Sequence, residues 1–85
     1  MAKVRMYSTA VCPFCQRAEL LLNSKGVTAI EKIRVDLDPR LREEMTSKTG
    51  RRTVPQIYIG DTHVGGFEEL AALERAGGLD ALLRA

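Results

Sequence analysis

Apolar residues recur along the chain with two different periods, and these periods outline the expected secondary structure. Residues 3–7 alternate between apolar and polar side chains, which predicts a strand with one face in the core. Residues 13–25 carry apolar side chains at helical spacing and are followed by Gly26, which predicts a helix with a glycine cap. Residues 29–36 are rich in β-branched side chains and predict a second strand, which a right-handed crossover places parallel to the first.

The second half of the chain shows one helical segment, two short strand-like segments and two further helical segments. An aspartate precedes Pro39, so we expect a mostly exposed helix that begins there and ends before Gly50. Residues 54–60 and 62–64 flank a Gly-Asp turn and predict an antiparallel hairpin. Leucines at helical spacing on both sides of Gly77 predict two terminal helices. This order predicts an α/β fold in which helices flank a four-stranded mixed sheet, built as βαβ and then ββα.

Length and composition favour one folded domain over residues 1–85. A chain of 85 residues that is 45% hydrophobic can bury a modest core. No secretory apolar segment follows Met1, and no run approaches the roughly 18 apolar residues of a membrane span, so we expect a cytoplasmic protein. The net charge is +2, and the arginines are interleaved with acids and lack aromatic neighbours. We therefore expect a monomer with neither a nucleic acid nor a membrane as partner.

The two cysteines of the chain, Cys12 and Cys15, lie where the first predicted strand gives way to the first helix. Their spacing on one helical turn suits a disulfide, whose Cα atoms lie roughly 5.5 Å apart. Pro13 suits the first helical position, so Cys12 falls at or beside the N-cap, where amides and the helix dipole favour an anion. Because the attacking species is the thiolate, we expect Cys12 to be the nucleophile and Cys15 the resolving thiol.

Cysteines at this spacing also form half of many zinc sites, but this chain lacks the other half. Zinc takes about four ligands. The chain has no further cysteine, and its single histidine, His63, lies in the predicted hairpin. We therefore expect no metal and interpret His63 as an ordinary polar strand residue. In a reducing compartment the cysteine pair then indicates catalytic redox chemistry.

A proline stands at the head of the third predicted strand, in Thr53-Val54-Pro55. Proline cannot donate a hydrogen bond to a sheet ladder, so a proline at the head of a central strand calls for a structural explanation. One interpretation is a simple strand start. The other is a cis Val54-Pro55 bond that leaves the backbone of Val54 available to pair with an extended peptide. The sequence leaves both interpretations open.

Two glycines, Gly65 and Gly66, precede Phe67 and Glu68 at the start of the third predicted helix. The first amides of a helix can hold an anion when they are exposed, so this segment is a candidate binding site. An ordinary turn and cap explains it as well, with Glu68 as a surface acid that complements the helix dipole.

Taken together, three segments resemble the glutaredoxin family in their order and spacing, and the likeness covers essentially the whole chain. The segments are Cys12-Pro13-Phe14-Cys15, Thr53-Val54-Pro55-Gln56-Ile57 and Gly65-Gly66-Phe67-Glu68-Glu69-Leu70. The chain is most similar to the small bacterial dithiol glutaredoxins. This resemblance implies a thioredoxin-like fold and the glutathione-dependent reduction of protein disulfides and of protein–glutathione mixed disulfides.

The resemblance also implies roles for individual residues. Cys12 matches the nucleophile and Cys15 the resolving thiol of the family. The residues that it implies for binding glutathione, the reducing cosubstrate, are Phe14, Arg42, Thr53, Val54, Pro55, Gly66, Phe67 and Glu68. Within this set, the backbone of residues 53–54 matches the segment that pairs with the cysteinyl part of glutathione. Residues 66–68 match the place that holds the γ-glutamyl end, and Arg42 matches a position that reaches the glycine carboxylate.

Three residues depart from the family pattern. Many relatives have a lysine where this chain has Thr9, which removes a positive charge near the expected thiolate. Activation of Cys12 is then expected to depend on the helix N-terminus, with a contribution from Arg17. Phe14 replaces the usual tyrosine and loses its hydroxyl, and Glu68 replaces the common aspartate, which changes the reach of the carboxylate.

Two alternatives to this function stay open at the level of sequence. One is a glutaredoxin-like protein that is reduced by thioredoxin reductase instead of glutathione. The other is an iron–sulfur cluster carrier, in which two chains share a cluster through Cys12 and glutathione. Pro13 disfavours the carrier, because cluster-binding relatives usually have a smaller residue there.

Overall fold

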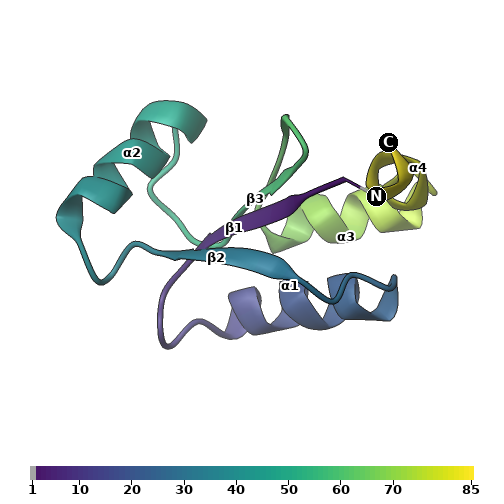
Figure 1. Ribbon diagram of the computed structural model, residues 1–85, viewed down its shortest axis with the longest axis horizontal. Coiled ribbons are helices and arrows are strands. Elements are labelled where there is room, and N and C mark those ends of the chain that lie inside the picture. Colours follow the sequence, from purple (N-terminus) through teal and green to yellow (C-terminus); the bar gives the residue numbers. More distant parts are fainter. Residues whose placement is uncertain (1) are drawn as a thin grey trace.

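A computed structural model describes residues 2–85 as a four-stranded sheet flanked by four helices (Figure 1). The elements are β1 (Val4–Ser8), α1 (Pro13–Ser24), β2 (Ile30–Arg34), α2 (Pro39–Thr49), β3 (Gln56–Ile59), β4 (Thr62–Gly65), α3 (Phe67–Arg75) and α4 (Leu79–Arg84). The strand order is β2-β1-β3-β4, with β1 parallel to β2 and the other two pairs antiparallel. The predicted mixed sheet and its element order are confirmed.

Local capping explains where the helices begin and end. Asp38 caps α2 by accepting a hydrogen bond of 2.9 Å from the backbone N–H of Arg40, and Pro39 takes the first helical position. Gly50 closes α2 with φ +72°, a left-handed conformation that favours glycine. The predicted third strand is shorter than expected and begins at Gln56. Pro55 has no N–H to donate to the ladder, so regular pairing starts after it.

Strand β1 is buried on both faces and separates two apolar clusters. Val4 and Met6 belong to the larger cluster, which lies between the sheet and helices α1, α3 and α4. Tyr7 faces the other way and packs in a smaller cluster with Val35 and with Met45 of α2. Figure 1 shows this division, with α2 on the opposite side of the sheet from α1 and α3. Side chains on the two faces of this strand therefore pack in two different apolar layers.

None of the helices within residues 2–85 combines the length and the apolar composition needed to span a bilayer. The two ends of the described chain lie together, because the backbone N–H of Ala2 donates a hydrogen bond of 2.8 Å to the carbonyl of Leu83. This contact ties α4 to the start of β1, at the end of the molecule away from α2 (Figure 1).

Helix α2 is also anchored to β1 by one polar contact. The Tyr7 hydroxyl donates a hydrogen bond of 2.8 Å to a carboxylate oxygen of Glu44. Tyr7 is only 3% exposed. Burial, followed by the hydrogen bond to Glu44, raises the pKa of Tyr7 to about 12.

This raised pKa predicts a loss of stability in alkali. The folded state holds the Tyr7 proton more tightly than the unfolded chain, whose tyrosine titrates near pH 10. The free energy of unfolding should therefore fall by up to about 2–3 kcal/mol between roughly pH 10 and 12. Urea unfolding across this window should show a smaller fall for Tyr7→Phe than for the wild type, while Tyr58→Phe serves as the matched control. Parallel curves for wild type and Tyr7→Phe would contradict the assignment.

Candidate active site

Cys12 is the N-cap of α1, as the sequence predicts. Pro13 occupies the first helical position, and the backbone N–H of Cys15 donates a hydrogen bond of 3.1 Å to the Cys12 sulfur. The sulfur thus accepts a hydrogen bond from an amide that has no partner within the helix. In the reduced protein the same amide and the helix dipole favour the thiolate of Cys12.

Cys12 and Cys15 form a disulfide, with their Cα atoms 5.2 Å apart. Both residues are buried, with 7% and 5% of their surfaces exposed. Cys12 lies at the N-cap of α1 and Cys15 lies one turn further along the helix, and both pack in the larger cluster. The pair can cycle between dithiol and disulfide, which is the chemistry of a thiol–disulfide oxidoreductase.

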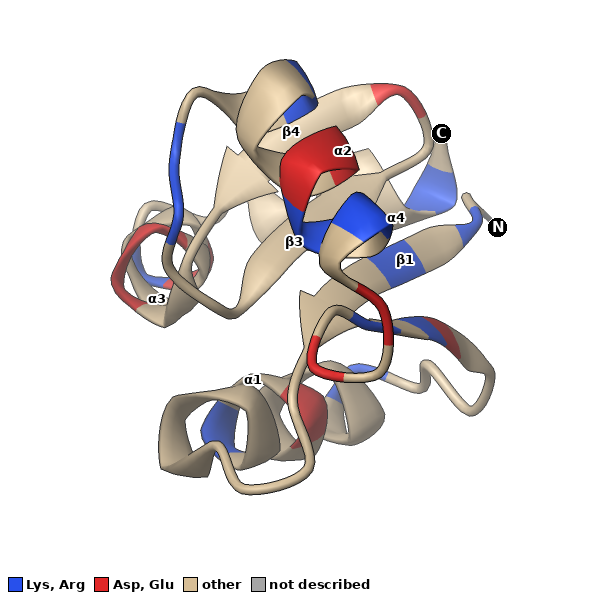
Figure 2. Cartoon of the chain, turned by 90° about the vertical axis from the view of Figure 1, so that its left-hand side faces the viewer, with Lys and Arg blue, Asp and Glu red and all other residues tan. Residues whose placement is uncertain are grey.

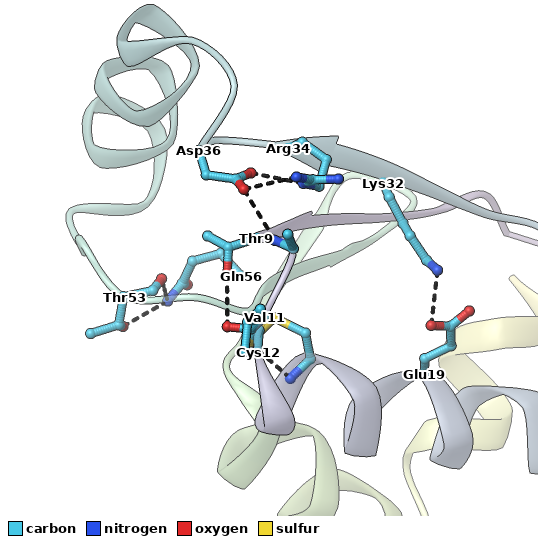
Figure 3. The surroundings of a disulfide bond; sticks show 11 residues. Thr9, Val11, Cys12, Glu19, Lys32, Arg34, Asp36, Thr53 and Gln56 are labelled. Atoms are coloured by element: carbon cyan, nitrogen blue, oxygen red, sulfur yellow. Dashed lines mark hydrogen bonds and ion pairs between the residues drawn. A yellow bond between two sulfur atoms is a disulfide. The ribbon is translucent and has the colours of Figure 1, made fainter.

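The loop that carries Cys12 is tied to the end of β2. A carboxylate oxygen of Asp36 accepts a hydrogen bond of 3.2 Å from the backbone N–H of Ala10. The same carboxylate is held by Arg34 through contacts of 2.7 and 2.8 Å (Figure 3). The Arg34 guanidinium, the largest cause, holds the pKa of Asp36 well below its usual range. Asp36 therefore stays ionised and anchors the loop.

A cavity of about 170 Å³ opens beside the turn between the two cysteines. The residues that line it are Phe14, Arg51, Thr53, Val54, Pro55, Gly66, Phe67, Glu68 and Glu69. The Val54-Pro55 peptide bond is cis, as the second interpretation of that segment requires, and the pairing of the Val54 backbone with an extended peptide stays a prediction. The rings of Phe14 and Phe67 lie 6.3 Å apart and form an aromatic wall. The fold thus brings together seven of the eight residues that the sequence nominated for glutathione.

Arg51 and Glu69 were not nominated from the sequence, and they organise one end of this cavity. Glu69 accepts a hydrogen bond of 2.7 Å from the backbone N–H of Gly66 and one of 2.9 Å from Arg51. The Gly66 amide, followed by Arg51, lowers the pKa of Glu69. Figure 2 shows the basic loop after α2 beside the acidic first turn of α3. A glutamate three residues after the N-cap, which can reach back to the N-cap amide as in one half of a capping box, is the sequence feature that points to Glu69.

Gly65 is required by its backbone conformation, and the space beside it is filled by this contact. Its φ is +112°, and a Cβ atom there would lie 2.7 Å from the Glu69 carboxylate and 3.1 Å from the Arg51 guanidinium. The sequence suggested that the first amides of α3 are available to an anion. The structure shows that one of them, the amide of Gly66, is already bound by Glu69.

A chain of hydrogen bonds from β4 holds Thr53 at the cavity. The His63 ring nitrogen lies 2.8 Å from the side-chain oxygen of Gln56. The amide nitrogen of Gln56 donates to the carbonyl and the hydroxyl of Thr53, at 3.0 and 3.3 Å. Burial, followed by the charge of Arg51, lowers the pKa of His63, so the ring is neutral near pH 7. His63 lies in β4, as predicted, and its contact with Gln56 links that strand to the segment beside the cysteines.

Arg42 is the one nominated residue that lines a different cavity. Its guanidinium donates a hydrogen bond of 2.9 Å to the carbonyl of Arg52. It faces a cavity of about 660 Å³ between α2 and the end of β2, together with Val35, Asp36, Pro39, Glu43, Thr46, Ser47 and Arg52. Its contact with a glycine carboxylate stays a prediction.

Thr9, which replaces the family's lysine, and Arg17, which is expected to help compensate for it, both have defined contacts. The Thr9 hydroxyl donates to the carbonyl of Val11 at 3.4 Å, so this side chain supports the loop. The guanidinium of Arg17 lies 5.3 Å from the centre of the Phe14 ring, in a cation–π arrangement. The contact seen for the Cys12 sulfur is the amide of Cys15, and a contribution of Arg17 to the thiolate stays a prediction.

Within residues 2–85 the structure contains no group of three or more histidine, cysteine, aspartate or glutamate side chains placed to hold a metal ion.

Comparison with known proteins places the chain among relatives of one kind. A family model described as glutaredoxin matches residues 4–64. The chain is 56% identical over 85 residues to a glutaredoxin from Pseudomonas aeruginosa, and the match covers 100% of both sequences.

Solved structures agree with this match. The solution structure of a glutaredoxin from Brucella melitensis is 47% identical with a TM-score of 0.84, covering 98% of this chain and 89% of that one. The crystal structure of a buckwheat glutaredoxin–glutathione complex is 27% identical with a TM-score of 0.88, covering 98% of this chain and 77% of the other. The fold is thioredoxin-like, and the chain, with its Cys12-Cys15 pair at the head of α1, belongs to the glutaredoxin family.

Proposed function

We propose that this protein uses glutathione to reduce protein disulfides and protein–glutathione mixed disulfides. The observation that carries the proposal is the position of Cys12, which caps α1 next to a cavity of about 170 Å³. This cavity offers an acid, an arginine, an aromatic wall and the backbone of residues 53–55. Glutathione is an extended peptide that carries an amine and two carboxylates, so its chemistry matches this lining. A similar glutaredoxin from buckwheat has been crystallised as a glutathione complex.

The mechanism begins with the thiolate of Cys12. It attacks a sulfur of the substrate disulfide, the substrate S–S bond breaks, and one substrate thiolate leaves while a mixed disulfide forms at Cys12. Cys15 can then attack the Cys12 sulfur and release the second product. Where the mixed disulfide joins Cys12 to glutathione, a second glutathione thiolate can instead attack the glutathione sulfur, which forms glutathione disulfide and releases the Cys12 thiolate. When Cys15 acts, the product is the Cys12–Cys15 disulfide seen in the structure. Glutathione returns this disulfide to the dithiol.

Cys12→Ser should abolish both activities. A serine hydroxyl is not ionised near neutral pH and cannot form the mixed disulfide. The test is glutathione-coupled reduction of a small mixed disulfide by the wild type and by Cys12→Ser. Appreciable turnover by the variant would show that the nucleophile is misassigned, and turnover of the wild type only with thioredoxin reductase would refute the glutathione donor.

Cys15→Ser should separate the two activities. A glutathione mixed disulfide at Cys12 can be resolved by a second glutathione, so deglutathionylation should persist. Reduction of an intramolecular protein disulfide needs the second thiol of the protein and should be lost. Both rates are measured on one glutathionylated peptide and one disulfide-bridged peptide. Equal loss of both activities would refute this division of roles.

Glu68→Gln tests the recognition of the γ-glutamyl end. The variant removes the negative charge that we expect to bind the glutathione amine, and a hydrogen bond to a charged group contributes about 1.5–3 kcal/mol. We expect kcat/KM to fall about 10-fold on a glutathionylated peptide, mainly through KM. The same peptide capped with mercaptoethanol should react unchanged, and Glu43→Gln on α2 is the charge-matched control. Equal losses on both peptides would show that Glu68 does not read the glutathione group.

A further inference from the structure

A second cavity beside the cysteines, of about 200 Å³, lies on the side that faces β2. Both Cys12 and Cys15 line it, together with Gln16, Glu19 and Lys32. The cavity proposed for glutathione lies on the other side, towards Thr53 and Glu68. Figure 3 shows Glu19 and Lys32 on one side of the disulfide and Thr53 on the other. The site proposed for glutathione therefore gives this second cavity no role.

Glu19 enters the second cavity from the same helix face as Cys15. The two residues are four apart on α1, a spacing that brings side chains to within about 5–6 Å between their Cβ atoms. Lys32 reaches across from β2, where it pairs in register with Met6 of β1. Its ammonium lies 2.9 Å from a carboxylate oxygen of Glu19, and their side chains are 45% and 34% exposed. The ion pair thus stands where the cavity meets solvent.

Cys15 needs a proton acceptor that the rest of its surroundings do not supply. Its thiol must become a thiolate before it attacks the Cys12 mixed disulfide. Cys15 is only 5% exposed and packs in the apolar cluster, so burial opposes its ionisation. Among the residues that line this cavity in the described part of the chain, Glu19 carries the one carboxylate.

We propose that Glu19 accepts the proton of Cys15 through water in this cavity during resolution of the mixed disulfide; the inference rests on the function proposed above. The proton passes from the Cys15 sulfur to the Glu19 carboxylate as the Cys15 sulfur bonds to the Cys12 sulfur. The bond between Cys12 and the substrate sulfur breaks, and its electron pair leaves with the substrate thiolate. The cysteine pair is oxidised by two electrons, the substrate disulfide is reduced by two, and Glu19 returns the proton to solvent.

The charges around Glu19 fit this role. From β2 it faces the ammonium of Lys32. Arg34, the next charged residue on the same face of that strand, is engaged with Asp36. Helix α1 contributes the uncharged Gln16 to the cavity, and β1 contributes Met6 and Ser8, which carry no charge. Lys32 therefore orients the carboxylate at the cavity mouth.

The test uses the reduced protein and an aromatic disulfide, dithiobis-nitrobenzoate, whose coloured thiolate is released in two phases. The first phase reports attack by Cys12 and the second reports attack by Cys15. In Glu19→Gln the first phase should be unchanged, and the second should slow by about 10-fold or more near neutral pH. The second phase should depend more steeply on pH in the variant than in the wild type, because without the carboxylate its rate follows the thiolate fraction.

Glu31→Gln is the matched control, because Glu31 forms an ion pair with Lys3 that is also 2.9 Å long but lies away from the cysteines. It should leave both phases unchanged. Lys32→Gln, which keeps the carboxylate but removes its orienting partner, should slow the second phase less than Glu19→Gln does. A second phase in Glu19→Gln that is as fast as in the wild type, or faster, overturns the proposal. A first phase that persists in Cys12→Ser would contradict the nucleophile assigned under the proposed function, whereas an unslowed second phase in Glu19→Gln contradicts only the role of Glu19. The failure of the proposed function is therefore distinguishable from the failure of this inference.

Discussion

The active site depends on the contact between the backbone N–H of Cys15 and the sulfur of Cys12. An amide in the first turn of a helix has no partner within the helix, so a sulfur at the N-cap can accept its hydrogen bond. This geometry requires that α1 begin at Pro13, after the short loop that follows β1. The strand is held on both sides by β2 and β3 and is packed on both faces, which gives the helix start a rigid support.

The cysteines lie between two cavities of different character. The cavity near residues 53–55 and the start of α3 has charged groups at its edge and aromatic rings on its wall, features suited to a peptide. The cavity near β2 contains both cysteines and the Glu19–Lys32 pair. Substrate binding and proton transfer therefore have separate places in our proposals, on opposite sides of the disulfide (Figure 3).

Sequence reasoning succeeded where local chemistry decides the structure. Pro13, Pro39 and Gly50 mark helix ends because proline fixes φ and removes a donor, while glycine adopts the left-handed conformation. It was less accurate at β3, where the strand begins at Gln56 because Pro55 cannot join the ladder. Arg42, which the resemblance groups with the glutathione residues, faces another cavity and bonds to Arg52, and its contact with a glycine carboxylate stays a prediction.

By itself the sequence determined the cysteine spacing, the cap at Cys12, the order of the elements and the likeness to glutaredoxins, because these depend on neighbours within a few residues or on motif order. The tertiary structure decided which distant groups meet. Glu69 accepts hydrogen bonds from the Gly66 amide and from Arg51. His63 contacts Gln56, which in turn holds Thr53. Lys32 forms an ion pair with Glu19. Most of these contacts join different elements, and their partners are set by strand register and by the way helices pack on the sheet. A one-residue change of register would turn Lys32 to the opposite face, so no local pattern could have specified its partner.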